Sequence, residues 1–473
     1  MADDVLRAAS LRKIANSRLS PRIIIRIVAL SAICIATVSA VFGVQPGLWQ
    51  PAAIAIATTL LWATGALPED QTALIFFSAA SLSGTGSPDV VFSGFTTGAL
   101  WLVFGGLVIG AAVRRTGLDR AIAVPVIARV KGTYTQAVLA ITLLSLILSF
   151  LVPSSMTRVI LMTPVVLAIC DALGMPAGRG RHGLVVTAVL MNYYFGTGIL
   201  PANVPNMALV GSLEKNLHVH LQYASYFLTY FPALSLLKAA IAVVLVSFAY
   251  RTPIVPIPRD TAKAVVDPPG RNFVALVLAV ALALWITDFA HGISPAWIAL
   301  TVAIIFMFPG IDIVPVSQFS ALVNMRPLFF VAGILGLGNF IAVSGLGSAA
   351  AVHLASLVGL SADGSLREAA LLTGIASAMG LLATHGGMAA LLPSLAQDLA
   401  RLSGLPIDIV VGTIVMGYSM LLLPYQVPPT VVGFQMANVP HRAAAVSVLW
   451  IGLVTSLVAV PSQFLWWRLI GFH

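Results

Sequence analysis

The most constraining feature of this chain is a short polar interruption inside a long apolar stretch, the sequence SFLVPSSMTRVILMTP at residues 149–164. The apolar arms on either side, 137–152 and 159–169, are each shorter than the ~20 residues that a helix needs to cross a bilayer core of ~30 Å. Between them Pro153 lacks a backbone donor, and the residues up to Arg158 carry hydroxyls and a cation. The pattern predicts a helical hairpin that turns inside a membrane. Its buried arginine is a candidate functional residue, unless it reaches a surface or forms a structural pair.

Composition places the chain among proteins that span a membrane several times. Hydrophobic residues make up 59% and charged residues 9% of the sequence, and the mean hydropathy is +1.00, which excludes an ordinary soluble domain. The formal net charge of +9 comes from cations in short loops between apolar segments, so it indicates topology and predicts no nucleic-acid partner. Cys34 and Cys170 both lie in apolar stretches, which predicts neither a disulfide framework nor a cysteine metal cluster.

The apolar segments divide the chain into two halves. A basic segment precedes an apolar run at 23–42, which is long enough to span and longer than the core of a cleaved signal peptide, the alternative interpretation. A proline-rich polar stretch separates the halves. The predicted parts are a basic N-terminus with a first transmembrane helix at 1–48, a first repeat at 49–250, a cytoplasmic linker at 251–271 and a second repeat at 272–473.

Matching glycines and prolines in the two halves indicate an internal duplication. The motif LPANVP at 200–205 recurs as LPYQVP at 423–428. Chance similarity between apolar segments is the alternative, but the matches keep one order and nearly one spacing. Three glycine pairs are each separated by 228 positions: Gly105 and Gly333, Gly110 and Gly338, and Gly117 and Gly345.

Charge placement indicates that the two repeats have opposite orientations. If the N-terminus is cytoplasmic and both interrupted pairs return to the side they came from, most cations fall on the cytoplasmic side, as the positive-inside rule requires. We therefore expect an all-α polytopic membrane protein with an inverted-topology repeat, two re-entrant helical hairpins and two broken transmembrane helices. The hairpin at 135–173 enters from the cytoplasm and the hairpin at 367–402 enters from outside. The expected location is the cell membrane, which in a bacterium is the inner membrane.

Four interruptions are expected to meet near the membrane midplane. They are the hairpin tips at 153–158 and 384–387 and the broken spans at 196–206 and 423–430. The prolines of each broken span cannot continue a helix and free carbonyls one turn earlier. Asn203 and Gln426 occupy equivalent positions, so we expect them to perform equivalent work. The alternative is that the prolines only kink two tightly packed helices.

Three motifs accompany the duplication: LWLVFGGLVIGAAVRRTGLDRAIA at 100–123, the PSSMTR tip, and the broken spans with VPN and VPPT. In these features the chain, from about residue 49 to the C-terminus, resembles the divalent anion/sodium symporter family of carboxylate and sulfate transporters. The resemblance implies a homodimer in which each subunit has a scaffold part and a mobile part. The mobile part carries both hairpins and both broken helices in an elevator-type cycle. Tip asparagines and threonines would contact the substrate carboxylate, and nearby carbonyls and hydroxyls would hold a sodium ion.

Both tips depart from the Ser-Asn-Thr sequence of that family. The first reads Ser154-Ser155-Met156 and the second Ala383-Thr384-His385, so both asparagines are missing and sodium dependence is in doubt. An arginine could instead pair bidentately with a carboxylate or sulfate. The predicted substrate-binding residues are Ser154, Ser155, Met156, Arg158, Asn203, Thr384, His385, Gln426 and Pro428. The predicted sodium ligands are Ser154, Ser155, Gly198, Thr384 and Gly386.

The predicted function is secondary active transport of a small organic or inorganic anion of the dicarboxylate, tricarboxylate or sulfate type, coupled to sodium or protons. A cation/proton antiporter is the first alternative, but no acidic residue falls at a hairpin tip or a broken span. An intramembrane enzyme is the second alternative, but the sequence has no HExxH motif and no pair of aspartates on spans. We therefore expect no enzyme activity. We also expect no cofactor besides a candidate sodium ion. His385 could couple transport to protons or be structural. Lys238 is a second buried cation that we do not assign to the substrate.

Overall fold

The computed structural model describes residues 21–41, 47–64, 66–122, 133–217, 219–254, 269–382 and 384–472. Within these ranges the chain forms helices and no strand, which confirms the all-α prediction. Five of the described helices are long and apolar enough to cross a bilayer: Gly98–Arg115, Tyr134–Leu151, Tyr223–Ala249, Arg326–Val343 and His441–Ile470. The chain is therefore a multi-span membrane protein.

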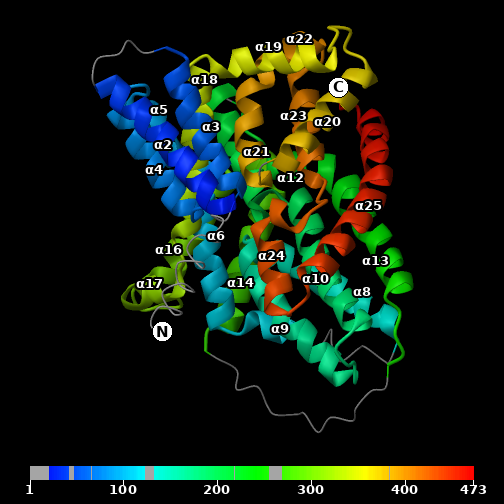
Figure 1. Cartoon of the computed structure of the whole chain (residues 1–473). Helices are drawn as coiled ribbons and strands as arrows, with labels where there is room; N and C mark the ends of the chain where they lie inside the picture. The colour runs from blue at the N-terminus through cyan, green and yellow to red at the C-terminus, as the bar shows by residue number, and fades with distance from the viewer. Residues whose placement is uncertain are drawn as a thin grey trace, which may run out of the picture.

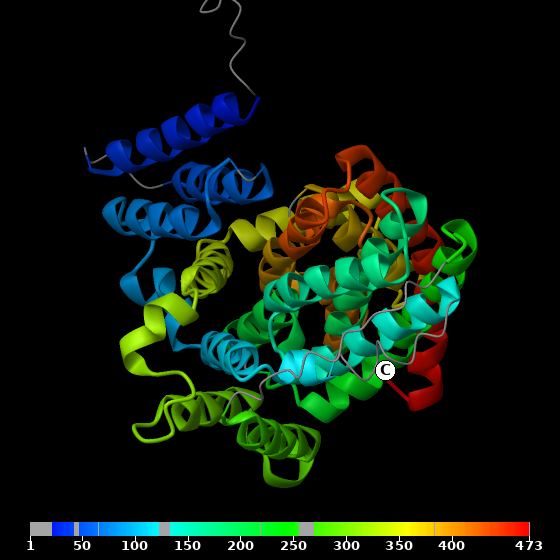
Figure 2. The same ribbon diagram turned by 90° about the horizontal axis from the view of Figure 1, so that it is seen from below.

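One set of helices, the first helix group, comes from the beginning of each half and stands to one side of the molecule (Figures 1 and 2). Its packing pairs α4 with α18 and α6 with α16, so segments far apart in the sequence lie side by side. Its larger members are α2 (Pro21–Val41), α3 (Trp49–Thr64), α4 (Glu69–Leu82), α6 (Gly98–Arg115), α14 (Arg271–Ile286), α16 (Pro295–Met307) and α18 (Arg326–Val343), with the short α5 (Pro88–Val91), α15 (Asp288–His291) and α17 (Phe319–Leu322) between them.

The second helix group contains two helical hairpins that approach from opposite ends of the molecule (Figure 1). The first is α8 (Tyr134–Leu151) and α9 (Ser155–Ala172); the second is α20 (Leu366–Leu382), then α21 (His385–Leu391), η5 (Leu392–Leu395) and α22 (Ala396–Ser403). Both hairpins turn where the polar tips were predicted. However, α8 is longer than the predicted arm at 137–152 and could cross a bilayer by length and composition, so the expectation that both arms are too short was wrong for this helix.

Each broken span is interrupted at its LPx(N/Q)VP motif, as predicted. In the first half α10 (Arg179–Gly198) is followed by η2 (Leu200–Ala202) and α11 (Val204–Leu217); in the second, α23 (Ile407–Ser419) is followed by η6 (Pro424–Gln426) and α24 (Pro428–Met436). Nearly all of α10 is buried, because it packs against both arms of the first hairpin and against α13 and α24. This helix forms the core of the second helix group.

The remaining long helices close the second group. In the first half α12 (Tyr223–Tyr230), a π-helical turn (Phe231–Leu237) and α13 (Lys238–Ala249) form one continuous helix. In the second half α25 (His441–Ile470) runs alongside it. The π turn begins at Phe231, contains Pro232 and leads directly to Lys238, which is fully buried.

Glycines at equivalent positions of the two halves have the same structural roles. A Cβ at Gly110 of α6 would lie 3.4 Å from the side chain of Thr157 in the first hairpin, and a Cβ at Gly338 of α18 would lie 2.8 Å from the carbonyl oxygen of Ala390 in the second. Gly117 and Gly345, which follow these helices, both have positive φ, of 64° and 77°. The first of these two glycine pairs lets a helix approach a hairpin and the second ends a helix in a left-handed residue, which is a physical reason for the repeated spacing.

The helix α19 (Leu346–Val358), which connects α18 to the second hairpin, was not predicted. Several predicted features lie outside the described residues: the N-terminal cations at 1–20, most of the linker at 251–271, and Ala383.

The close approach at Gly338 predicts an effect on stability. Replacing Gly338 with alanine should lower the free energy of unfolding by ~1–3 kcal/mol, because the new methyl group would overlap a backbone carbonyl that cannot move independently. Gly374, in the interior of α20, has no neighbour within 4 Å of an added Cβ and provides the matched control. Thermal unfolding in detergent would compare the two variants, and an equal melting temperature for both would contradict the proposed contact.

Candidate functional site

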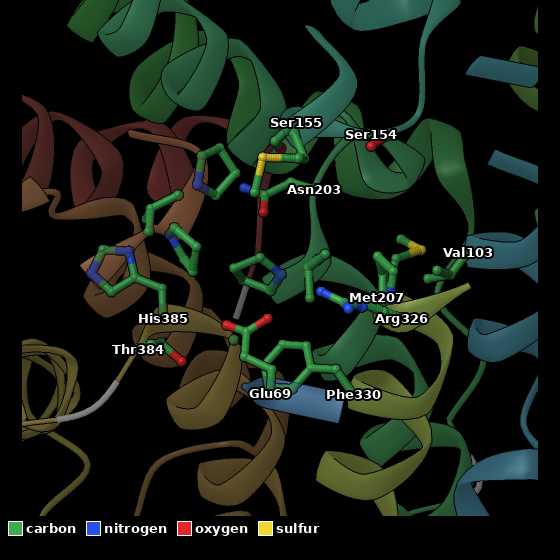
Figure 3. Close-up of a pocket in the computed structure, with 18 of the residues that line it drawn as sticks. Glu69, Val103, Ser154, Ser155, Asn203, Met207, Arg326, Phe330, Thr384 and His385 are labelled. Atoms are coloured by element: carbon green, nitrogen blue, oxygen red, sulfur yellow. The ribbon is translucent and has the colours of Figure 1, made fainter. Parts of the chain in front are cut away.

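A cavity of about 280 Å³ lies between the two helix groups, where both hairpin tips and both helix breaks meet (Figure 3). The first group contributes residues at the start of α4 and α18, and the second contributes the tips and breaks. Nine predicted site residues line the cavity: Ser154, Ser155, Met156, Asn203, Thr384, His385, Gly386, Gln426 and Pro428. The predicted convergence of the four interruptions is therefore present in this structure.

The first turns of several helices face this cavity. The N-terminal residues of α9, α11 and α24 line it, as do those of α21, which continues through η5 into α22. A helix N-terminus carries unpaired N–H groups and about half a positive charge from the helix dipole. Helix N-termini that converge in this way favour an anionic solute.

The two hairpin tips have the same cap geometry. The Ser154 hydroxyl oxygen accepts from the backbone N–H of Thr157 at 3.3 Å, and the Thr384 hydroxyl oxygen accepts from the backbone N–H of Gly387 at 3.3 Å. Each is an N-cap in extended backbone conformation. Because the oxygens accept in these bonds, both hydroxyl protons remain available as donors to a solute.

Asn203 places an unsatisfied donor at the cavity. The residue is 3% exposed, and among the described residues its side-chain Nδ2 has no hydrogen-bond partner. A buried amide without a partner is unfavourable, and an acceptor on a bound solute would relieve that penalty. The orphan is a donor, so it suits an anion better than a cation.

His385 is held by a hydrogen-bond chain that indicates its tautomer. The Tyr193 hydroxyl donates to the backbone carbonyl of Tyr418, and it also lies 2.6 Å from the His385 Nδ1. Since a phenol has one proton, Nδ1–H must donate to the Tyr193 oxygen. The neutral ring then has an acceptor lone pair on Nε2, which is buried and without a partner. The hydrogen-bond chain therefore fixes the orientation of the His385 ring and leaves Nε2 as an acceptor without a described partner.

Arg158 does not reach the cavity, and we therefore revise the prediction that it meets the anion. It is 1% exposed and is absent from the cavity wall. Its guanidinium donates to the side chain and carbonyl of Asn192, to the carbonyls of Val152 and Ala202, and at 3.4 Å to the hydroxyl of Ser155. These bonds leave no donor directed to a solute, because the side chain joins the first hairpin to the adjacent broken helix.

Two other predicted residues also have structural contacts. The Gln426 Oε1 accepts from the backbone N–H groups of Leu422 and Leu423, and its Nε2 donates to the carbonyl of Gly380 at 2.8 Å. Gln426 thus lines the cavity, but its side chain bonds to backbone groups around the second break. Asn203, at the equivalent position of the first break, has a free amide donor among the described residues. Gly198, a predicted sodium ligand, lies away from the cavity, where an added Cβ would approach the Ser235 hydroxyl to 2.5 Å.

The first helix group contributes charged residues to the cavity that were not predicted. Glu69 and Asp70 at the start of α4 and Arg326 at the start of α18 all line the cavity. Figure 3 shows the Glu69 carboxylate pointing into the same space as Asn203. Arg326 Nε lies 3.7 Å from Asp70 Oδ2, whereas the Glu69 carboxylate makes no hydrogen bond or ion pair with a described residue. Proline followed by two acids between apolar segments is a helix-start signal that could have drawn attention to this position.

Comparison with known proteins identifies the family. A family model described as "Sodium:sulfate symporter transmembrane region" matches residues 18–473. The chain belongs to the sodium:sulfate symporter family. This is a family of transporters and not of enzymes, so the family membership establishes a membrane transporter of anions and confirms the resemblance found from the sequence.

Two similar proteins agree with this placement. A protein from Cupriavidus necator described as "Membrane protein" is 24% identical over 402 residues, covering 81% of this chain and 77% of that one. The crystal structure of the Alcanivorax borkumensis YdaH transporter, described as revealing an unusual topology, superposes with a TM-score of 0.56 and 15% identity over 81% of this symporter-family chain and 88% of that chain. At that identity the likeness supports the fold alone.

Two nearby asparagines allow a binding role to be separated from a structural role: we expect Asn203 to bind the solute and Asn206 to stabilise the fold. Replacing Asn203 with alanine should weaken anion binding by roughly tenfold or more, because one hydrogen bond to a charged group contributes ~1.5–3 kcal/mol. Its melting temperature should stay near wild type, since its Nδ2 has no partner in the protein.

Asn206 is the control, because its Nδ2 donates to the carbonyls of Gly196 and Ile199 at 2.8 and 3.0 Å. Its alanine variant should unfold at a lower temperature. Anion-dependent protection in a thermal unfolding assay would measure binding and stability together, and equal losses of stability in both variants would refute the distinction.

Proposed function

We propose that this protein is a secondary active transporter of a small di- or tricarboxylate or of sulfate, which moves its substrate by an elevator mechanism. The observation that carries the proposal is the convergence of helix N-termini from both repeats, with the unpartnered Asn203 amide, on one small cavity. The second helix group directs the Asn203 amide and the Ser154 and Thr384 hydroxyls to the space, and such donors suit an anion. The cavity volume of about 280 Å³ suits a small solute.

The position of the cavity supports an elevator movement. One wall belongs to the first helix group, which we take as the scaffold, and the other wall carries the hairpin tips and helix breaks. Rigid-body displacement of the second group along the first would carry the solute without dismantling the tips. We further propose a homodimer in the cell membrane with a cytoplasmic N-terminus, in which the first hairpin enters from the cytoplasm and the second from outside.

Sodium and protons are the two candidate coupling ions. Sodium is named in the family description. A proton is favoured by the Glu69 carboxylate, which faces the solute space without a described partner. The same carboxylate also keeps cation/proton antiport as a second candidate function, because the argument against it was the lack of an acid at the interruptions.

Counterflow in proteoliposomes tests the proposal. Protein reconstituted with unlabelled succinate, citrate or sulfate inside should accumulate the labelled form of at least one of them, and the Asn203→Ala variant should do so with reduced affinity. Uptake of a monovalent cation against a proton gradient, with no counterflow of any of the three anions, would instead establish antiport and refute the proposed function.

Replacing Glu69 with glutamine should flatten the pH dependence of uptake. The ionised carboxylate repels an anion and its protonated form does not, so wild-type uptake should rise as pH falls, and the variant should keep low-pH behaviour at high pH. A tenfold gain in apparent affinity at high pH corresponds to a like-charge interaction of ~1.4 kcal/mol. The other titratable or charged groups on the cavity wall are Asp70, Arg326 and His385.

Asp70 provides the control, because Arg326 partly neutralises it. Asp70→Asn should change the pH profile less than Glu69→Gln does. Labelled-anion uptake measured across the range from acidic to mildly alkaline pH decides the matter, and superimposable profiles for wild type and Glu69→Gln would contradict this role.

A further inference from the structure

Broken helices leave backbone carbonyls without their usual helical partners, and inside a membrane these oxygens need another donor or a cation. At the first break, side chains supply the donors. Near the end of α10 the Thr197 hydroxyl donates to the carbonyl of Tyr193 (3.0 Å), and the Ser235 hydroxyl donates to that of Tyr194 (2.6 Å). At the break the Asn206 amide donates to the carbonyls of Gly196 (2.8 Å) and Ile199 (3.0 Å). The Tyr226 hydroxyl donates to the carbonyl of Thr197 (2.9 Å). Five carbonyl oxygens that could have contributed to a cation site therefore already accept a hydrogen bond from a side chain.

Arg158 completes this arrangement at the first hairpin. Its Nη1 donates to the carbonyl of Val152, where α8 has ended, at 2.7 Å and to the carbonyl of Ala202 in η2 at 2.9 Å. Its Nη2 donates to the carbonyl of Asn192 in α10 at 3.1 Å. A positive charge thus lies among carbonyl oxygens from three separate helical elements, which is the environment that a hard metal cation would otherwise seek.

Lys238 has the corresponding position at the second break. Its Nζ donates to the backbone carbonyl of Ser419 at 2.7 Å and to the Ser419 hydroxyl at 2.9 Å, where α23 ends. It also lies over the ring of Tyr194, 5.8 Å from its centroid. The C-terminal end of a helix carries negative partial charge, so a fixed ammonium there is favourable. The next carbonyl, that of Tyr418, accepts from the Tyr193 hydroxyl.

Neither cation has a carboxylate partner among the described residues. No described ion pair includes Arg158 or Lys238, and both side chains are fully buried. Their charges are therefore balanced by carbonyl and hydroxyl dipoles, as the charge of a bound metal ion would be. A sodium ion approaching the same oxygens would be repelled by the fixed charge and would find the acceptors taken.

We infer that Arg158 and Lys238 occupy the positions of coupling cations at the two helix breaks, so that this member of the family transports its anion without sodium. The inference rests on the proposed anion transport and concerns the coupling ion only. The family description names sodium as the coupled ion, and Arg158 and Lys238 of this chain are the reason for expecting otherwise here.

The wild-type protein tests the inference without any variant. Thermal unfolding of the purified full-length protein in detergent should be the same in sodium, potassium and choline chloride at equal ionic strength. Uptake of the anion that gives counterflow should change by less than about twofold when choline replaces sodium. A saturable, sodium-specific rise in melting temperature, or a tenfold or greater loss of uptake without sodium, would overturn the inference.

The two failures are distinguishable. If wild-type protein shows no counterflow of succinate, citrate or sulfate, the proposed function fails, while the unfolding measurement still decides whether sodium binds.

A second experiment removes one fixed cation. Lys238→Gln, confirmed to elute as a single species from a size-exclusion column, should lose at least tenfold in uptake in choline medium and regain a substantial part of it in sodium, because the Ser419 oxygens become free. Lys238→Arg keeps the charge and should remain within about threefold of wild type in both media. Wild-type uptake by Lys238→Gln in choline, or no recovery in sodium, would overturn the equivalence between Lys238 and a bound cation.

Discussion

Every backbone N–H and C=O group within a bilayer needs a partner, and this requirement governs the structure more than any other. Two hairpin tips and two helix breaks interrupt the helical bonding that ordinarily meets it. The polar side chains buried in the second helix group are therefore mostly donors directed at carbonyl oxygens, among them Arg158, Asn206 and Lys238. The breaks in turn expose the first turns of several helices to one cavity. The same interruptions therefore leave carbonyl groups that need donors and form the site that can bind an anion.

The hairpin tips and helix breaks lie together inside the molecule, and the neighbouring helices must pack closely around them. The tips must lie against neighbouring helices without intervening side chains, which explains the glycines at equivalent positions of α6 and α18. The buried α10 contacts both arms of the first hairpin as well as α24 of the other repeat, so it connects the two halves of the duplication. The first helix group packs largely within itself, which leaves the cavity between the groups.

The architecture could be predicted from the sequence because it depends on spacing: proline positions, apolar lengths and a repeated glycine pattern locate hairpins and breaks directly. The site was less accessible. Arg158 lies one turn after the cap residue Ser154, and a helical side chain leans back toward the N-terminus, so its guanidinium returns to the hairpin backbone and not to the solute. Glu69 was missed because its approach to the tips depends on packing between distant segments, which no local pattern encodes.

The two hairpins are held by different kinds of interaction. Arg158 joins the first to its neighbours through charge-assisted bonds, whereas the second is joined by the neutral side chains of Gln426, Tyr425 and Tyr193. Charge-assisted bonds are roughly twice as strong as neutral ones. The second hairpin is therefore held to its neighbours by weaker interactions than the first. Two hairpins of similar shape thus differ in how firmly they are anchored, and the hairpin of the second half is the easier one to displace.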